Sequence, residues 1–317
     1  MLLIYGFFTT AGGLFATVLE VGDFACGGVD VDSRLRFGAH DAPDIWLRHY
    51  PTDVDQSEAK VTRSALSVSL IEQELARLGG LSVLLEVRDS VGSTNNEVLS
   101  YLSALTTHGV VVVTADEQTA GRGRLDRSWS SPWAAGIALT LGVPASRIVG
   151  EITSTPLRAG LAVQRALATL GVDVLVKWPN DIVTAQGNKL GGLLSSLHDQ
   201  NVVVGIGLNV SLDESELPTA TATSLTLLGH EVSREKLIAH IVHEFHNVIT
   251  QSEWLDNYLT VSATVGQQVI LHRQGLTDVH GTAVAFAHDG SILIENEQGT
   301  QTFSIGDVEH LRAADSN

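Results

Sequence analysis

Two arginines and two glycines alternate in the segment Gln118–Arg124, which reads Gln-Thr-Ala-Gly-Arg-Gly-Arg. Residues two positions apart in an extended chain point the same way, so Arg122 and Arg124 can reach one anion together. The planar, permanently charged guanidinium suits phosphate and carboxylate groups, and Gly121 and Gly123 let the backbone approach such a group closely. The segment therefore predicts an anion site, although an isolated Gly-Arg-Gly-Arg is also compatible with a solvated basic turn.

Other segments carry polar or charged residues at close spacing. Gly-Ser-Thr-Asn occupies 92–95, Lys-Trp-Pro-Asn-Asp occupies 177–181, Lys-Leu-Gly-Gly occupies 189–192 and Gly-Ile-Gly-Leu-Asn occupies 205–209. Together with the arginine segment, and in the same order, they resemble the signatures of the biotin protein ligase family. The resemblance runs from about residue 64 to the C-terminus. One such motif is a weak signal, whereas five in family order are specific.

The resemblance implies an ATP-dependent ligase. Such an enzyme activates biotin as biotinyl-5′-AMP and transfers it to one lysine of a biotin carboxyl carrier protein. ATP, biotin and Mg²⁺ are the expected cofactors, and no protein-side metal ligand is predicted. The first step brings a carboxylate and a phosphate together, so cations must stabilise the developing charge. Arg122, Arg124 and Lys189 are the predicted catalytic cations; the alternative for Lys189 is an ordinary surface lysine.

The resemblance also assigns the biotin ring to Ser93, Thr94, Asn95 and Gln118. A neutral bicyclic urea is best held by fixed hydroxyls and amides inside an apolar pocket. The first two side chains also suit the N-cap of a following helix, and Gln118 is also compatible with a polar loop. The predicted biotin-binding set is Ser93, Thr94, Asn95, Gln118, Arg122, Gly123, Arg124 and Lys189, and the predicted nucleotide-binding set is Gly121, Arg124 and Asn209.

Asp181 completes the predicted catalytic residues. We expect it on the strand that holds Lys177, with Lys177, Pro179 and Asp181 on one face. A carrier lysine has an ordinary pKa of about 10.4, so freeing its proton at pH 7 costs roughly 4.6 kcal/mol. A nearby carboxylate can guide or accept that proton. The alternative is that Asp181 only braces the Lys177 strand.

Two features depart from the family pattern. Asp126 stands where the family loop has a third glycine, which leaves Arg122 and Arg124 in place but changes the loop between them and Arg127. The turn from Asp181 to Lys189 is one residue longer than in related ligases, which a surface hairpin tolerates.

Three histidines, His240, His243 and His246, follow one another at intervals of three residues. A zinc-binding His-Glu-x-x-His helix needs ligands four residues apart. We therefore interpret the histidines as the polar flank of an amphipathic helix.

Composition bounds the remaining possibilities. The 317 residues leave room for about two domains, and 44% hydrophobic with 17% charged residues is typical of a globular chain. A formal net charge of −17 disfavours a nucleic-acid partner, because non-specific binding depends on Lys and Arg at phosphates. A single cysteine, Cys26, fits the reducing cytoplasm, where we expect the protein. The apolar start Met1–Leu19 lacks the basic residues of a signal peptide, and no membrane partner is predicted.

Periodicity divides the chain into three parts. Residues 1–63 are Gly-rich and acidic without sustained periodicity, and we expect a poorly ordered or loosely attached extension. In the predicted catalytic domain, 64–260, helices at 95–105, 156–170 and 233–249 mix with strands at 109–114, 135–143, 173–178, 181–184, 189–198 and 202–210. This predicts an α+β fold, a mixed and largely antiparallel sheet flanked by helices, as in class II aminoacyl-tRNA synthetases and biotin ligases. Short strands within 261–317 predict a small C-terminal β-barrel.

Two other functions compete with the ligase reading. A lipoate–protein ligase shares the fold and the adenylate chemistry, but its Arg-Arg…Gly-Gly-Gly segment and His-Asp pair are absent from the corresponding places. A biotin-responsive repressor needs a basic helix-turn-helix, which residues 1–63 do not resemble. The sequence leaves the oligomeric state open between monomer and homodimer.

Overall fold

A computed structural model describes residues 2–10, 13–21, 63–106, 109–125 and 127–311. The chain divides into two units, Met1–Ala59 and Lys60–Asn317. In the first unit, β1 (Leu2–Thr10) and β2 (Gly13–Val21) pair antiparallel along their whole length, which the sequence analysis does not predict. The rest of the predicted N-terminal extension, up to residue 62, and Asp126 lie outside the described residues.

An eight-stranded mixed sheet forms the centre of the second unit, in the order β3-β4-β6-β10-β9-β8-β7, with β5 paired to β4 off this path. The β3–β4 pair is parallel and the other pairs are antiparallel. The predicted largely antiparallel sheet is confirmed. The strands are β3 (Val83–Val91), β4 (Val110–Arg122), β5 (Ser128–Ser131), β6 (Gly136–Pro144), β7 (Leu175–Lys177), β8 (Asp181–Val183), β9 (Lys189–His198) and β10 (Asn201–Asn209).

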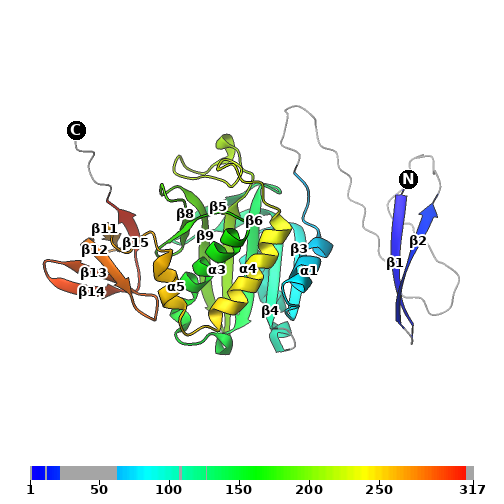
Figure 1. Ribbon diagram of the computed structural model, residues 1–317, viewed down its shortest axis with the longest axis horizontal. Helices are drawn as coiled ribbons and strands as arrows, with labels where there is room; N and C mark the ends of the chain where they lie inside the picture. The colour runs from blue at the N-terminus through cyan, green and yellow to red at the C-terminus, as the bar shows by residue number, and fades with distance from the viewer. Residues whose placement is uncertain (1, 11–12, 22–62, 107–108, 126, 312–317) are drawn as a thin grey trace. The chain divides into compact units, whose positions relative to one another are not determined.

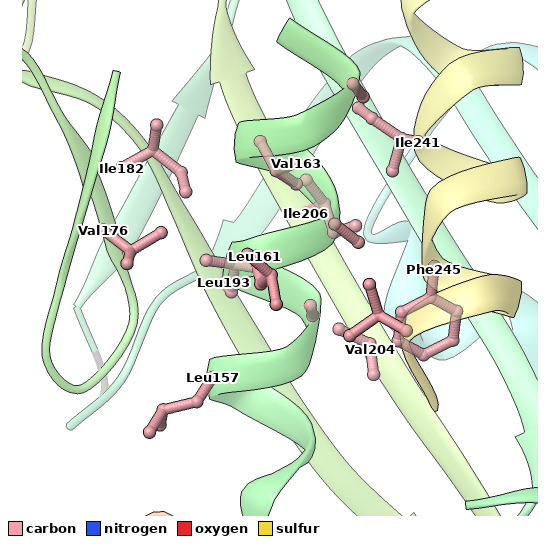
Figure 2. Close-up of a cluster of buried hydrophobic side chains, with 14 of the residues drawn as sticks. Leu157, Leu161, Val163, Val176, Ile182, Leu193, Val204, Ile206, Ile241 and Phe245 are labelled. Carbon is pink, nitrogen blue, oxygen red and sulfur yellow. The ribbon is translucent and has the colours of Figure 1, made fainter. Parts of the chain in front are cut away.

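Helices cover one face of this sheet (Figure 1). They are α1 (Val68–Arg77), α3 (Thr155–Thr169), α4 (Arg234–Ile249) and the short α5 (Trp254–Thr260). Figure 2 shows Leu161 of α3 and Phe245 of α4 turned toward Val204 and Ile206 of β10. All four side chains are buried. Because successive strand residues alternate between faces, the even-numbered residues of β10 meet the helices and the odd-numbered ones face away from them.

The other face of the sheet carries α2 (Thr94–Glu97) and the 3₁₀ helix η1 (Val98–Thr106). Val98 packs there with Val111 and Val113 of β4 and Val203 of β10, all fully buried. The segment 95–105 is thus helical as predicted, although most of it takes the tighter 3₁₀ form. Gly205 and Gly207 follow Val203 on the same face of β10.

The C-terminal residues form a second, five-stranded antiparallel sheet in the order β14-β13-β12-β11-β15. Its strands are β11 (Gln268–His272), β12 (Val279–Phe286), β13 (Ile292–Asn296), β14 (Gly299–Phe303) and β15 (Asp307–His310). The strands β14 and β15 lie at opposite edges, yet only residues 304–306 join them. So short a link spans roughly 13 Å at most, so the sheet must curl. No ladder pairs the two edges, and the predicted closed barrel is corrected to an open, curled sheet.

Short 3₁₀ turns complete the described elements: η2 (Ala145–Arg147), η3 (Ile152–Ser154) and η4 (Glu214–Glu216). Trp178 joins the two sheets of the second unit. Its buried indole N–H donates to the Gly290 carbonyl at 2.9 Å, and its backbone N–H donates to Thr264 Oγ1 at 3.1 Å. The boundary at residues 260/261 between a catalytic and a C-terminal domain stays a prediction. No helix within the described ranges has the length and apolarity that a membrane span requires.

Candidate active site

One cavity of about 290 Å³ gathers residues from five parts of the second unit. Its walls come from the start of α2, the end of β4 with the following loop and β5, the β7–β8 turn, strands β9 and β10, and the C-terminal sheet. Nine of the residues predicted from sequence line it: Ser93, Thr94, Asn95, Gln118, Arg122, Gly123, Arg124, Asp181 and Lys189. Segments separated by more than 90 residues in the chain thus converge on one space.

Uncharged hydrogen-bonding groups line one wall. Gln118 Oε1 accepts from the Thr94 backbone N–H at 2.9 Å and from the Thr94 hydroxyl at 3.0 Å. The buried Thr140 hydroxyl lies 2.8 Å from Thr94 Oγ1 and 2.6 Å from Asn95 Oδ1. Ser93 holds the N-cap position of α2, but its side chain makes no capping hydrogen bond. This wall is therefore fixed by its own hydrogen bonds, and Ser93 lines the cavity without using its hydroxyl to cap α2.

Two glycines of β10 make room for this wall. A Cβ on Gly205 would collide with the Asn95 carboxamide, and a Cβ on Gly207 would collide with the Trp129 ring. Gly205 and Gly207 lie on the face of β10 turned away from α3 and α4, where their missing side chains widen the cavity. The alternation of glycines in this motif thus has a steric cause.

Lys189 and Asp181 form a charged pair at the cavity. Lys189 Nζ lies 2.6 Å from Asp181 Oδ1, and the two side chains are 38% and 25% exposed. The expectation that Asp181 shares a strand with Lys177 is wrong, because Lys177 ends β7 and Asp181 begins β8, with a turn containing a cis Trp178–Pro179 bond between them. Lys177 and Asp181 are direct antiparallel partners, so they still share a face.

The arginine loop is tied to the C-terminal sheet. Arg124 Nη1 donates to Asp307 Oδ1 at 2.9 Å and Arg124 Nη2 to the Gly306 carbonyl at 3.2 Å, while Arg127 Nη2 lies 2.8 Å from Asp307 Oδ2. Arg122 is exposed and has no ion-pair partner among the described residues. Sequence reasoning missed Asp307, because a single acid in a short C-terminal strand carries no motif signal.

The C-terminal sheet adds titratable groups near the same cavity. His272 hydrogen-bonds through Nε2 to Glu309 at 3.0 Å and through Nδ1 to Asp278 at 2.9 Å. These two carboxylates, Glu309 first, raise the pKa of His272 above its ordinary value. Burial, and then the charge of Lys177, lower the pKa of His310 to about 4. Sequence reasoning also missed these groups.

Two predicted nucleotide-binding residues lie beside the cavity rather than on its wall. Gly121 is packed so closely against Trp129 that a Cβ would meet the Trp129 carbonyl. Asn209 is buried and donates from Nδ2 to the Thr223 carbonyl at 2.9 Å. Both are placed to shape the site through the backbone next to them.

His240 corrects the interpretation of the α4 histidines as a polar flank. It is only 8% exposed, and its ring nitrogens lie 3.0 Å from Glu74 of α1 and 3.0 Å from Thr169 of α3. Packing of α1 and α3 against α4 therefore buries a position that the helical pattern alone leaves at the surface. Within the described ranges, no group of three or more His, Cys, Asp and Glu side chains is arranged to hold a metal ion.

Comparison with known proteins decides the family. Residues 87–213 match the biotin/lipoate A/B protein ligase family. A biotin–[acetyl-CoA-carboxylase] ligase from Mycobacterium tuberculosis is 34% identical over 242 residues, which cover 72% of this chain and 89% of the relative. The chain belongs to the biotin/lipoate A/B protein ligase family. It is therefore an enzyme of the ligase class.

Other family members agree in sequence and in fold. The bifunctional ligase/repressor BirA of Escherichia coli is 27% identical, over 77% of this chain and 78% of that protein. The structure of the Aquifex aeolicus biotin protein ligase in complex with biotin and ATP superimposes with a TM-score of 0.60 at 26% identity, covering 73% of this chain and 99% of that chain. The α+β fold predicted from sequence is that of this family.

Proposed function

We propose that this ligase activates biotin with ATP, as biotinyl-5′-AMP, and transfers it to a lysine of a biotin carboxyl carrier protein. The observation that carries the proposal is one cavity lined by two chemically different groups of side chains. Ser93, Asn95 and Gln118 supply neutral donors and acceptors, and Arg124 and Lys189 supply cations. A bicyclic urea suits the first group, and a carboxylate with a triphosphate suits the second.

In the first step a carboxylate oxygen of biotin attacks the α-phosphorus of ATP, and pyrophosphate leaves. Negative charge accumulates on the phosphoryl oxygens as the new bond forms. Lys189 and Arg124 are fixed cations next to this charge, and removing one such preorganised donor typically costs about 2–4 kcal/mol of transition-state stabilisation. Arg122, which is exposed at the cavity rim, is the third cation that we assign to the phosphates or to the biotin carboxylate.

In the second step the carrier ε-amine attacks the acyl carbon, and AMP leaves. The amine must first lose a proton, for which we assign Asp181. Asp181 Oδ1 accepts from Lys189 Nζ at 2.6 Å. An anion that draws Lys189 toward itself frees Asp181 to accept a proton from the incoming lysine. The pair therefore links phosphate binding to the transfer step.

Mg²⁺ usually reaches such sites with the nucleotide, held by phosphate oxygens and one or two carboxylates. The carboxylates that line the cavity are Asp181, Asp307 and Glu309, so its donor set is compatible with the ion. When bound, Mg²⁺ would neutralise part of the triphosphate charge. The roles assigned to Lys189 and Arg124 do not depend on it.

Lipoate is the competing acyl group within the family. Its dithiolane ring offers no N–H or carbonyl, so Ser93, Asn95 and Gln118 would be left without ligand partners in the cavity. Unpaired polar groups of this kind discriminate strongly against a substrate that cannot satisfy them. The polar wall therefore favours biotin.

The test is a parallel labelling reaction. The full chain is incubated with ATP, Mg²⁺ and a carrier domain, and with biotin or lipoate at equal concentration. We expect streptavidin-reactive carrier with biotin and AMP release that depends on biotin. Preferred labelling with lipoate, or no biotin-dependent AMP release, would overturn the proposal.

A further inference from the structure

Arg63 binds the loop 211–223, which lies next to the proposed active site. Its guanidinium donates to both carboxylate oxygens of Glu216, at 2.9 Å to Oε1 and 2.5 Å to Oε2. It also donates to the Ser211 carbonyl at 2.7 Å and to the Ser211 hydroxyl at 3.2 Å. The Arg63 side chain is only 13% exposed and that of Glu216 is 25% exposed. Arg63 thus joins the start of the second unit to the chain just after β10.

The far end of the same loop is bonded to Lys189. The Lys189 N–H donates to the Thr221 carbonyl at 2.7 Å, and the Thr223 N–H donates to the Lys189 carbonyl at 2.9 Å. Thr223 also accepts from Asn209 Nδ2. Two residues predicted for the site, Lys189 and Asn209, are therefore held by the segment that begins at Glu216.

Between these two attachments the loop has little packing of its own. Residues 218–221 are exposed, and a space of about 640 Å³ is lined by Leu217, Pro218, Thr223 and their neighbours. A segment with few buried contacts opens at low free-energy cost unless it is anchored. The bidentate Arg63–Glu216 pair anchors one end of the loop. The other end holds the Lys189 backbone through its two hydrogen bonds, so the position of Lys189 depends on that anchor.

We infer that Arg63 is a positioning residue for adenylate formation, acting through the 211–223 loop on Lys189. The inference deepens the proposed function and rests on it for the catalytic readout. The pair has the geometry that restrains a segment most strongly, because the planar Arg fork and a carboxylate form two parallel hydrogen bonds. Arg63 does not line the cavity, so its effect reaches the substrates only through this loop.

The experiment is a double-mutant cycle in the full chain with two readouts. We measure biotin-dependent pyrophosphate release for Arg63→Ala, Glu216→Ala and the double variant, and hydrogen exchange of the Lys189 and Thr223 amides in each. We expect about tenfold slower pyrophosphate release in each single variant and no further loss in the double variant, because neighbours that act as one unit are not additive. The two amides should exchange faster, while amides in α3 and α4 stay protected.

Two further variants make the cycle specific. Arg63→Lys keeps the charge but loses the fork, so we expect partial recovery. Arg77→Ala is the matched control, because Arg77 makes the same two-pronged contact with Glu74 on α1, far along the chain from the loop. It should leave both readouts within about twofold of wild type, because the Arg77 side chain is exposed and Glu74 keeps its contact with His240.

The possible results separate the role of Arg63 from the proposed function. Additive losses, unchanged amide exchange at Lys189 and Thr223, or an equal effect of Arg77→Ala would overturn the role of Arg63. If Arg63→Ala fails to fold, Glu216→Gln provides the same test with a side chain of similar shape. If the wild-type chain releases no pyrophosphate with biotin, the proposed function fails, and the exchange measurement still tests the anchor by itself.

Discussion

Lys189 and Arg124 are cations at the same cavity, but the molecule holds them in different ways. Lys189 begins β9, and its backbone is bonded on the side of the 211–223 loop through Thr221 and Thr223. Arg124 belongs to the loop after β4 and is held by its side chain, which contacts Asn180, Gly306 and Asp307. One cation is placed by the backbone and the other by contacts that another anion can replace.

The two ways of holding a cation suit different parts of the proposed reaction. A side-chain ion pair that is partly open to solvent is worth about 1 kcal/mol or less, so a triphosphate can draw Arg124 away from Asp307. The Lys189 side chain also leaves a carboxylate, Asp181, for the phosphate, but its backbone stays fixed by β9 and the 211–223 loop. We therefore expect Lys189 to act on the chemistry of activation and Arg124 to act on retention of the bound adenylate.

The largest expected effect is that of Lys189→Ala. The phosphoryl charge would lose a preorganised cation, and pyrophosphate release should fall by about 30- to 1,000-fold. Lys189→Arg should recover only part of it, since a planar fork replaces a point charge. Pyrophosphate release with biotin and ATP measures the effect, and a loss of less than about threefold would contradict the role of Lys189.

Asp181→Asn should separate the two steps. We expect pyrophosphate release within about threefold of wild type, and carrier labelling about 100-fold slower, at the lower end for a proton-transferring group. Single-turnover labelling with preformed biotinyl-5′-AMP isolates the transfer. Equal losses in both steps would mean that Asp181 serves mainly to hold Lys189.

Arg124→Gly should act on retention. Without the guanidinium, we expect the adenylate to dissociate about tenfold faster, a loss of about 1.4 kcal/mol, and to label exposed lysines of a bystander protein. Asp307→Asn is the matched variant, because it keeps Arg124 with its contacts to Asn180 and Gly306 and removes the carboxylate that pairs with Arg124 and Arg127. If Asp307→Asn releases the adenylate as fast as Arg124→Gly does, Arg124 works through Asp307 rather than on the ligand.

The smallest expected effect is on the pH dependence of stability, through His310 at the end of β15, the strand that carries Asp307. Burial, and then Lys177, lower the pKa of His310 to about 4, against an ordinary value of about 6.5. The unfolded chain therefore binds a proton as the pH falls below 6.5 while the folded protein does not, so stability decreases until the pH reaches about 4. Between pH 7 and 5.5 this amounts to about 1 kcal/mol.

His310→Gln should remove that part of the pH dependence. Melting temperatures of the wild type and the variant at pH 7 and 5.5 measure it, and we expect the smaller decrease in the variant. An equal decrease in both would mean that His310 is more solvated than its position beside Thr264 and Lys177 implies.

Hydrophobic periodicity in the sequence located the helices that bury one continuous apolar face. The predicted helices at 156–170 and 233–249 correspond to α3 and α4, which pack their apolar sides on the sheet. The strand β3 and the helix α1 were missed. No residue of β3 is fully buried, since it is an edge strand, and an edge strand has no strong hydrophobic pattern to reveal it. Missing α1 also hid the burial of His240, because Glu74 of α1 is its partner.

Residue types and their spacing within one segment predict the groups that act inside a single motif. Three examples are the two arginines spaced by glycine, the lysine before paired glycines, and Ser-Thr-Asn before a helix. Each can be recognised from residue type and spacing along one segment. With the other two motifs they carry the family resemblance, which together with periodicity predicts the fold class, and nine of the predicted residues line the cavity.

The packing of the folded chain sets what those groups contact. It paired Lys177 with Asp181 across a hairpin, set Thr140 against Thr94 and Asn95, placed Asp307 against Arg124 and Arg127, and tied Arg63 to Glu216. Each contact except the first joins residues at least 45 positions apart. Contacts at that separation follow from strand order and the curl of the C-terminal sheet, and strand order depends on the packing of the whole chain rather than on any one segment of it.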